Sequence, residues 1–461
     1  MSDPTDHIEA DRADAYVLSP REVTAILYAV DIGDADKLRD LMEPLHAADI
    51  ADLLEQVNAF DRARLIRLYG REFDGEILSE LEESIRQDVI SILNPQVLAE
   101  AVRELDSDDL VDLVEDLDEP RQGAILDALE DADRIVVEQS LAYPEETAGR
   151  LMQREVVMAP EHWNVGQAID HLRSAEHLPE QFYHVVLVDP RLHPIGNVTL
   201  GKLMGSRRDV PLQDITEDVF RVIPATQDEG DVAYAFNQYH LISAPVVDNE
   251  GRLVGVITID DAMVVLDEEH EEDILRLAGV HDESSISDSV AETSRHRLPW
   301  LVVNMMTAVA AAIVISLFED TISSFVALAA LMPIVASMGG NAGTQSLTVA
   351  VRALATKDLT ASNVGRVIRR EAMVGLINGV FFALVIGTLS FLWYDRPALG
   401  LVIGAALITN MLVAALAGTA VPIVLEKIGV DPALASGTFV TTTTDLMGFF
   451  AFLGLATLVL I

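Results

Sequence analysis

A single carboxylate, Asp445, lies deep inside an apolar stretch near the end of the chain, directly after four threonines, Thr441 to Thr444. An ionised side chain inside a membrane costs about 2.5–3.5 kcal/mol on insertion scales, so such residues are usually functional. We predict that Asp445, with Thr441 and Thr444, lines a cation pore. Oxygen ligands without cysteine indicate a hard ion, Mg²⁺ or Ca²⁺. A protonated Asp445 bonded to a neighbouring helix is the alternative.

The stretch MPIVASMGGNAGTQS, residues 332–346, is poorly suited to face lipid. Proline frees a backbone carbonyl, glycines let helices approach closely, and amide side chains need polar partners or water. We predict that its special residues line the same pore: Pro333, Gly339, Gly340, Asn341 and Gln345. Tight helix packing alone is the alternative reading.

Two sets of acidic residues have helical spacing. Asp108 and Asp112 are four residues apart, and Glu269, Glu272 and Asp273 follow an i, i+3, i+4 pattern, so each set shares one helix face. If two such faces approach each other, their repulsion opposes closure until a divalent ion bridges them, which describes a sensor. The alternative is an ordinary acidic helix start, which the helix dipole favours.

The amino-terminal part of the sequence contains two kinds of duplicated element. Residues 21–148 have apolar positions at helical spacing, and 48–68 superposes on 108–128 at an offset of 60, which indicates stacked helical hairpins. Residues 185–204 superpose on 244–263 at an offset of 59, with Gly196 matching Gly255 and Thr199 matching Thr258. Each copy predicts strand, turn, strand and helix, so two βαββα units are expected.

Charge and hydropathy divide the 461 residues into two halves. The first 297 carry 24 basic and 66 acidic residues, and the remainder carry 7 and 8. An acidic surface repels nucleic acid and attracts cations, although salt adaptation explains the same composition. The chain has no cysteine, which excludes disulfides and thiolate metal sites. No nucleophile and base pair, phosphate-binding loop or HExxH motif is present, so we do not predict an enzyme.

The second half predicts five membrane spans, at about 298–318, 322–350, 372–393, 398–425 and 432–461. Basic residues gather before span one, between spans two and three and between spans four and five. The positive-inside rule therefore places the soluble half in the cytoplasm and the carboxyl terminus outside. The amino terminus shows no secretory signal, which agrees with that orientation.

The most specific stretches, PIVASMGGNAGTQS, RALATKDL and DPALASGTFVTTTTDLMG, resemble the MgtE family of magnesium channels and transporters. The resemblance implies a homodimer with a pore on the twofold axis, held closed by intracellular Mg²⁺. It assigns Asp445 to the pore. It also implies a regulatory Mg²⁺ role for seven acids: Asp108, Asp112, Asp261, Glu269, Glu272, Asp273 and Asp431. Some members have Asn where this chain has Gly437, so an amide ligand at that position is not expected.

Residues from about 152 to 266 resemble a tandem CBS domain pair. In that family, residues at the positions of Thr258 and Asp260 hold a nucleotide ribose. The first copy has Gly201 in place of the aspartate. We therefore predict ATP or another adenosine nucleotide at one site, with a ligand-free dimerising module as the alternative.

Together these features predict a multidomain membrane protein with an all-α superhelical cytosolic domain, an α/β tandem CBS pair and an α-helical membrane domain of five spans. The expected boundaries are a flexible amino terminus (1–20), an acidic helical domain (21–148), the CBS pair (149–266), a connecting plug helix (267–297) and the membrane domain (298–461). The expected function is Mg²⁺ uptake by a multi-pass homodimer in the lipid bilayer of the plasma (inner) membrane. The alternatives are a divalent cation transporter coupled to protons or sodium, and a non-conducting Mg²⁺ or nucleotide sensor.

Overall fold

The computed structural model describes residues 18–103, 105–115, 117, 119–127, 129–175, 178–179, 181–280 and 290–461. The chain forms two compact units, residues 1–267 and 268–461, and each is described here by itself. Most of the predicted flexible amino terminus, and residues 281–289 of the predicted plug segment, lie outside the described residues.

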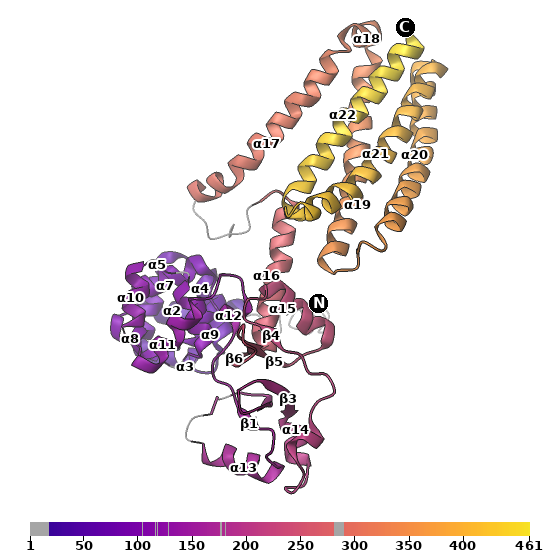
Figure 1. Cartoon of the computed structure of the whole chain (residues 1–461). Coiled ribbons are helices and arrows are strands. Elements are labelled where there is room, and N and C mark those ends of the chain that lie inside the picture. Colours follow the sequence, from indigo (N-terminus) through magenta and orange to yellow (C-terminus); the bar gives the residue numbers. More distant parts are fainter. Residues whose placement is uncertain are drawn as a thin grey trace, which may run out of the picture. The chain divides into compact units, whose positions relative to one another are not determined.

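The first unit begins with a stack of short helices around one apolar core (Figure 1). The first of them starts at a capping box, in which Ser19 and Glu22 each bond the other's backbone, with proline at the first helical position. The helices are α2 (Pro20–Ile32), α3 (Ala35–Met42), α4 (Ala47–Gln56), α5 (Ala59–Tyr69), α6 (Glu76–Ser79), α7 (Glu83–Ile92), α8 (Pro95–Ala101), α9 (Ser107–Glu115), α10 (Glu119–Leu126), α11 (Asp131–Ser140) and α12 (Ala148–Leu151), with the short 3₁₀ turn η1 (Gly70–Glu72) after α5.

Helix boundaries reproduce the predicted offset of 60 residues. Helix α4 begins at Ala47 and α9 at Ser107, while α5 begins at Ala59 and α10 at Glu119. Each pair is a helical hairpin whose apolar face enters the core. The duplication read from the apolar pattern therefore describes the real packing unit of this region.

Two three-stranded sheets of identical topology complete the first unit. In each, the first two strands are parallel and the last two antiparallel. Pairing of His184 with Thr199 recurs as Ser243 with Thr258, which confirms the offset of 59. The elements are β1 (Met158–Pro160), α13 (Val165–Ser174), β2 (His184–Val188), β3 (Pro194–Thr199), α14 (Leu200–Gly205), η2 (Leu212–Ile215), β4 (Ile223–Pro224), α15 (Glu229–Tyr239), β5 (Ser243–Val247), β6 (Leu253–Thr258) and α16 (Ile259–Leu277).

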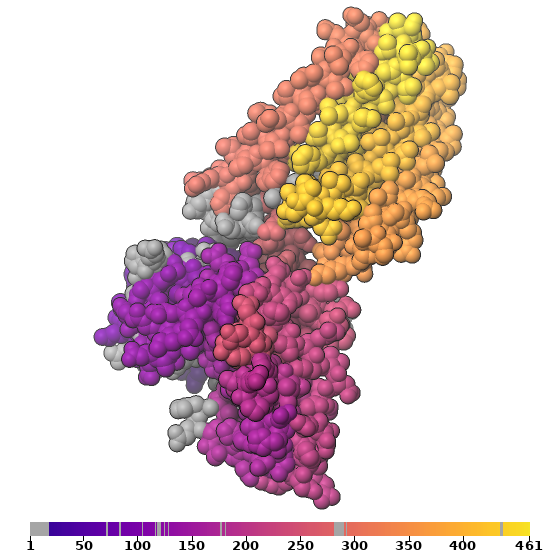
Figure 2. Space-filling model, in the orientation of Figure 1, coloured from indigo at the N-terminus to yellow at the C-terminus, as the bar shows by residue number. Residues whose placement is uncertain are grey.

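The second unit is a bundle of long helices in which α21 packs against α19, α20 and α22. Helix α17 packs on α22, and the two lie side by side on the face seen in the space-filling view (Figure 2). The helices are α17 (Val290–Ser316), α18 (Glu319–Ser324), α19 (Ala327–Ala355), α20 (Val364–Tyr394), α21 (Pro397–Lys427) and α22 (Pro432–Leu460).

Four stretches of the described chain are long and apolar enough to cross a membrane: 293–316, 364–394, 397–427 and 437–460. They correspond to the first, third, fourth and fifth predicted spans. The second predicted span falls on α19, which is not among these four although its 29 residues reach about 43 Å. Polar residues such as Asn341 and Gln345 lower its mean hydropathy. The helix can lie in a membrane only if those side chains face other helices or water and not lipid.

Candidate functional site

Helix α19 carries a polar stripe along its exposed side. The exposed residues recur every three or four positions, which places them on one helix face. They are Pro333, Ser337, Asn341, Thr344, Gln345 and Thr348. The Asn341 amide donates to Ser337 Oγ at 3.5 Å within this stripe. We call these six residues the α19 stripe.

Helix α22 carries a second polar row that includes the predicted pore aspartate. Thr438, Thr441 and Asp445 follow a spacing of three and four, and all three are at least partly exposed in the single chain. Thr438 donates to Asn304 of α17 at 3.1 Å. Asp445 makes no hydrogen bond or ion pair with the part of the chain that the structure describes, so its carboxylate is available to a ligand. Gly340 lies partly exposed on α19.

Two predicted pore-lining residues are placed in helix packing instead. Gly339 is buried against the amide of Asn410 on α21, and a side chain there would overlap that amide. Thr444 is fully buried, and its hydroxyl donates to the backbone oxygen of Thr441 at 2.9 Å. Both residues are thus buried in the single chain, and their place in a pore stays a prediction.

Asn410 is a structural residue that the sequence analysis missed. It is fully buried in α21, and its amide donates to the Val335 carbonyl of α19 at 2.9 Å. A side chain added to Gly448 of α22 would lie 2.7 Å from the same amide. Asn410 therefore sets how closely the two helices with polar rows approach α21. A lone amide in an apolar span was the signal that could have identified it.

At the start of α22, Asp431 caps the helix and accepts an ion pair. Its Oδ1 accepts from the Ala433 amide at 2.7 Å, and its Oδ2 lies 3.0 Å from the guanidinium of Arg276 near the end of α16. The same guanidinium lies 2.7 Å from Glu272. Burial and the charge of Asp431 raise the pKa of Asp273, against the lowering effect of Arg276. Glu269 is exposed on the same helix.

In the first unit, Asp108 and Asp109 of α9 and Asp261 of α16 form an acidic cluster, the α9–α16 cluster. Burial raises the pKa of Asp108 well above its usual range, and the charge of Asp261 raises it further. Burial raises the pKa of Asp109 to about 7, with Asp108 adding to it. Burial likewise raises the pKa of Asp261 to about 7, against the hydrogen bond from Thr258. Ionisation of these carboxylates therefore destabilises the folded state.

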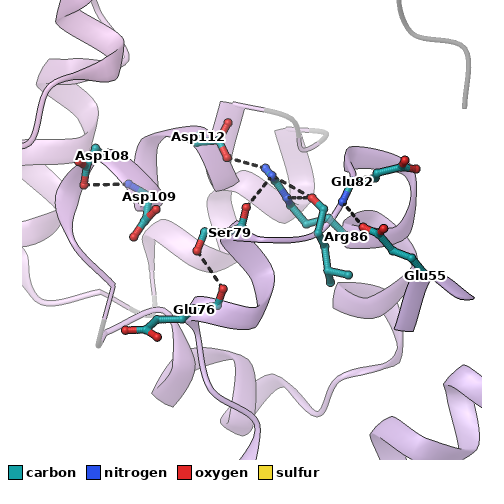
Figure 3. A network of polar contacts seen from close by, with 9 residues as sticks. Glu55, Glu76, Ser79, Glu82, Arg86, Asp108, Asp109 and Asp112 are labelled. Atoms are coloured by element: carbon teal, nitrogen blue, oxygen red, sulfur yellow. Dashed lines mark hydrogen bonds and ion pairs between the residues drawn. The ribbon is translucent and has the colours of Figure 1, made fainter. Parts of the chain in front are cut away.

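Asp112, predicted to act with Asp108, is held elsewhere (Figure 3). Its Oδ2 lies 2.8 Å from the guanidinium of Arg86, a buried arginine that also donates to the backbone oxygen of Leu81. Arg62 and Asp88 form the same kind of pair at 3.3 Å, 24 residues earlier. Asp112 thus has a structural partner, and Asp109 is the acid that shares the buried position with Asp108.

The two halves of the strand-rich region meet at a small cleft that is lined by residues of both copies. His184 Nδ1 and Ser243 Oγ, which occupy equivalent positions in the two copies, are hydrogen-bonded across it at 2.6 Å. Thr258 lines the cleft, but its hydroxyl donates to Asp261 at 2.5 Å. Asp260 is exposed and does not line this cleft. Nucleotide binding through Thr258 and Asp260 therefore stays a prediction.

The donor groups of the α9–α16 cluster and of the α22 start are carboxylate oxygens, which suit Mg²⁺. Within the described ranges, no three histidine or acidic side chains are already arranged to hold a metal ion. Mg²⁺ retains several waters and needs only one or two carboxylates, so partial protein coordination fits its chemistry. The sites are suited to a hydrated cation rather than to a closed protein cage.

Comparison with known proteins covers both units. A family model described as a divalent cation transporter, MgtE, matches residues 332–455. The MgtE intracellular N domain matches residues 45–146, and the CBS domain matches residues 210–268. The chain is 32% identical to "Magnesium transporter MgtE" of Thermus thermophilus over 443 residues, covering 94% of this chain and 97% of that protein. It is 35% identical to the Enterococcus faecalis protein of that name, covering 70% and 71%.

Two solved structures resemble about half of the chain. The cytosolic domain of the Mg²⁺ channel MgtE in complex with ATP is 28% identical, with a TM-score of 0.49, and covers 53% of this chain and 99% of that chain. The soluble part of a magnesium transporter is 24% identical, with a TM-score of 0.46, and covers 54% and 98%.

Proposed function

Because the chain belongs to the MgtE family of magnesium transporters, as its sequence predicted, we propose that it is a Mg²⁺ channel. Mg²⁺ passes along the polar rows of α19 and α22. Intracellular Mg²⁺ bound to the acidic cytosolic groups closes it. The ion is thus both substrate and regulator, and we propose no catalytic activity.

One observation supports the pore above all: polar residues stay exposed on α19 and α22 of a single chain. The α19 stripe and the row from Thr438 to Asp445 cannot face hydrocarbon without a large desolvation cost. A second copy on a twofold axis would turn both rows toward a shared aqueous path. The proposed lining is Pro333, Gly340, Asn341, Gln345, Thr441 and Asp445.

Asp445 is proposed to hold hydrated Mg²⁺ in this path. A carboxylate from each copy would supply two negative charges, and Mg²⁺ would keep most of its water shell. A side chain with no partner in the described chain can serve this role without breaking an existing contact. Asp445 is the one charged residue within α22, Pro432–Leu460.

The α9–α16 cluster is proposed as one regulatory site. Its carboxylates resist ionisation because they are buried beside one another. A divalent cation would remove that cost and stabilise the arrangement that holds Asp108 near Asp261, which shifts the population toward the closed state. Asp109 joins Asp108 and Asp261 here, whereas Asp112 is proposed to act through Arg86.

Five spans, with α19 as the second, would place the first unit in the cytoplasm and the carboxyl terminus outside. A cytoplasmic first unit is required if intracellular Mg²⁺ is to act on it. An adenosine nucleotide is proposed at the cleft lined by Thr258, which must widen to admit it.

The test is Mg²⁺ flux into proteoliposomes containing the full-length protein. Asp445→Asn should reduce flux by more than about tenfold, because it removes the fixed charge that concentrates the cation. Asp395→Asn, at an exposed acid between α20 and α21, is the matched control and should conduct normally. Wild-type flux by Asp445→Asn would refute the pore assignment.

The same vesicles separate a channel from coupled transport. Flux through a channel follows the Mg²⁺ gradient and membrane potential alone. Dependence on an opposing proton or sodium gradient would instead establish the coupled alternative. Absence of flux, with Mg²⁺ binding retained, would establish the sensor.

A further inference from the structure

Arg276 places a fixed positive charge between acids of two different helices. Its guanidinium nitrogens lie 3.0 Å from Asp431 at the start of α22 and 2.7 Å from Glu272 on its own helix, α16. The side chains are 25%, 31% and 38% exposed for Arg276, Asp431 and Glu272. Partly buried pairs are less screened by water and salt than surface pairs, so these contacts carry more weight.

The surroundings hold this arginine in place. The next residue, Leu277, packs on a small apolar cluster formed by Leu347 and Val351 of α19 with Ala433 and Val440 of α22. The end of α16 is thereby fixed against both helices that carry the proposed pore lining. This packing keeps the backbone of Arg276 close to Asp431.

The acids that Arg276 contacts are two of those proposed to bind regulatory Mg²⁺. A carboxylate oxygen within 3.0 Å of a guanidinium already holds one cation, so a divalent ion must compete with that guanidinium for it. Two cations also repel each other at such distances. Pairing with Arg276 and binding of Mg²⁺ at Asp431 therefore weaken one another.

We infer that Arg276 is a tethered cation that competes with Mg²⁺ for Glu272 and Asp431, and so sets the Mg²⁺ concentration at which the channel closes. The inference rests on the proposed regulation. When binding requires a minor, unpaired state, the apparent dissociation constant rises by the inverse of that state's population. Removing the competitor lowers the concentration needed.

The experiment measures the full-length protein in lipid nanodiscs across a Mg²⁺ titration by hydrogen exchange of residues 268–277. Mg²⁺-dependent flux in proteoliposomes is measured beside it. Arg276→Gln should move both midpoints to Mg²⁺ concentrations about threefold to tenfold lower, as expected for loss of a competing ion pair of ordinary strength. Arg276→Lys keeps the charge and should stay within about twofold of wild type.

Arg252→Gln is the matched control. Arg252 also bridges two acids, Asp248 at 2.7 Å and Glu250 at 2.9 Å, but within a surface hairpin of the first unit. It should leave the midpoint unchanged, which separates loss of local competition from loss of one positive charge in the chain.

The opposite result has a clear meaning. If Arg276 merely ties α16 to α22, Arg276→Gln weakens closure and raises the midpoint. A raised or unchanged midpoint in a protein whose wild type responds to Mg²⁺ would overturn the inference alone. A wild-type protein with no Mg²⁺-dependent protection or closure would instead overturn the proposed regulation, and the inference with it.

Discussion

The acids of the α9–α16 cluster and Asp431 all lie at helix starts, where the helix dipole favours negative charge, yet their neutralisation differs. At Asp431 the chain supplies its own counter-ion, Arg276. At Asp108, Asp109 and Asp261, burial and neighbouring acids raise the pKa values. One acidic group is already compensated, and the other is compensated only by protons or an added cation.

This difference indicates what each region responds to. An uncompensated buried cluster gains stability from any cation that enters it, so it binds divalent cations at a lower concentration. A compensated group gives up an ion pair before it binds a new cation, so its response requires a higher concentration. Within one protein, two acidic sites of similar sequence can therefore differ in their working range.

The largest expected effect on stability follows from removing one negative charge from the α9–α16 cluster. Asp109→Asn should raise the free energy of unfolding of the first unit at pH 8 by about 1–3 kcal/mol without divalent ions, since each unit of raised pKa costs about 1.4 kcal/mol. Thermal unfolding of the full-length protein in detergent measures it. Asp267→Asn, at an exposed acid later in α16, should change little. A lower unfolding temperature for Asp109→Asn would contradict the claim that ionised Asp109 destabilises the folded cluster.

The next difference is a pH dependence. A folded pKa of about 7 against an ordinary value of 3.8 means that the folded state binds more protons between these limits. The penalty is absent below about pH 4 and complete above about pH 7, so stability falls as pH rises through this window. Wild type should therefore lose about 1–2 kcal/mol relative to Asp109→Asn between pH 6 and pH 8. If the unfolding free energies of the two proteins changed in parallel between pH 6 and pH 8, Asp109 would not be the source of the pH dependence.

The smallest expected effect, of opposite sign, is at Asp431. Asp431→Asn keeps a good helix cap but loses the ion pair with Arg276, so it should destabilise the start of α22 by about 0.5–1 kcal/mol. Hydrogen exchange of the first turns of α22 without Mg²⁺ is the measurement, with Asp395→Asn as the control. Slower exchange in the Asp431 variant would show that Arg276 does not compensate this acid.

The fold was largely predictable from local patterns. Helical spacing gave the stacked hairpins with their offset of 60, and strand pairing confirmed the offset of 59. The polar residues of α19 were recognised because they interrupt an apolar run. Periodicity did not identify Gly339 and Thr444 as buried residues, nor Asn410 as the neighbour of Gly339, because which side of a helix is buried depends on the other helices.

For the acidic sites, the sequence identified most of the groups but not their partners. The i, i+4 spacing predicted that Asp108 and Asp112 act together, whereas in the structure Asp112 forms an ion pair with Arg86, 26 residues earlier. The same spacing in Arg62 and Asp88 was the available signal. Asp109 was missed because its burial depends on contacts outside its own helix.

The sequence by itself determined the duplicated units, the apolar spans and a deep carboxylate at Asp445, because each follows from residue type and spacing along a continuous segment. Only the tertiary structure decided which acids carry a counter-ion. Arg276 and Asp431 are 155 residues apart, and a Coulomb interaction depends on distance in space and on local burial, neither of which the linear order of residues records.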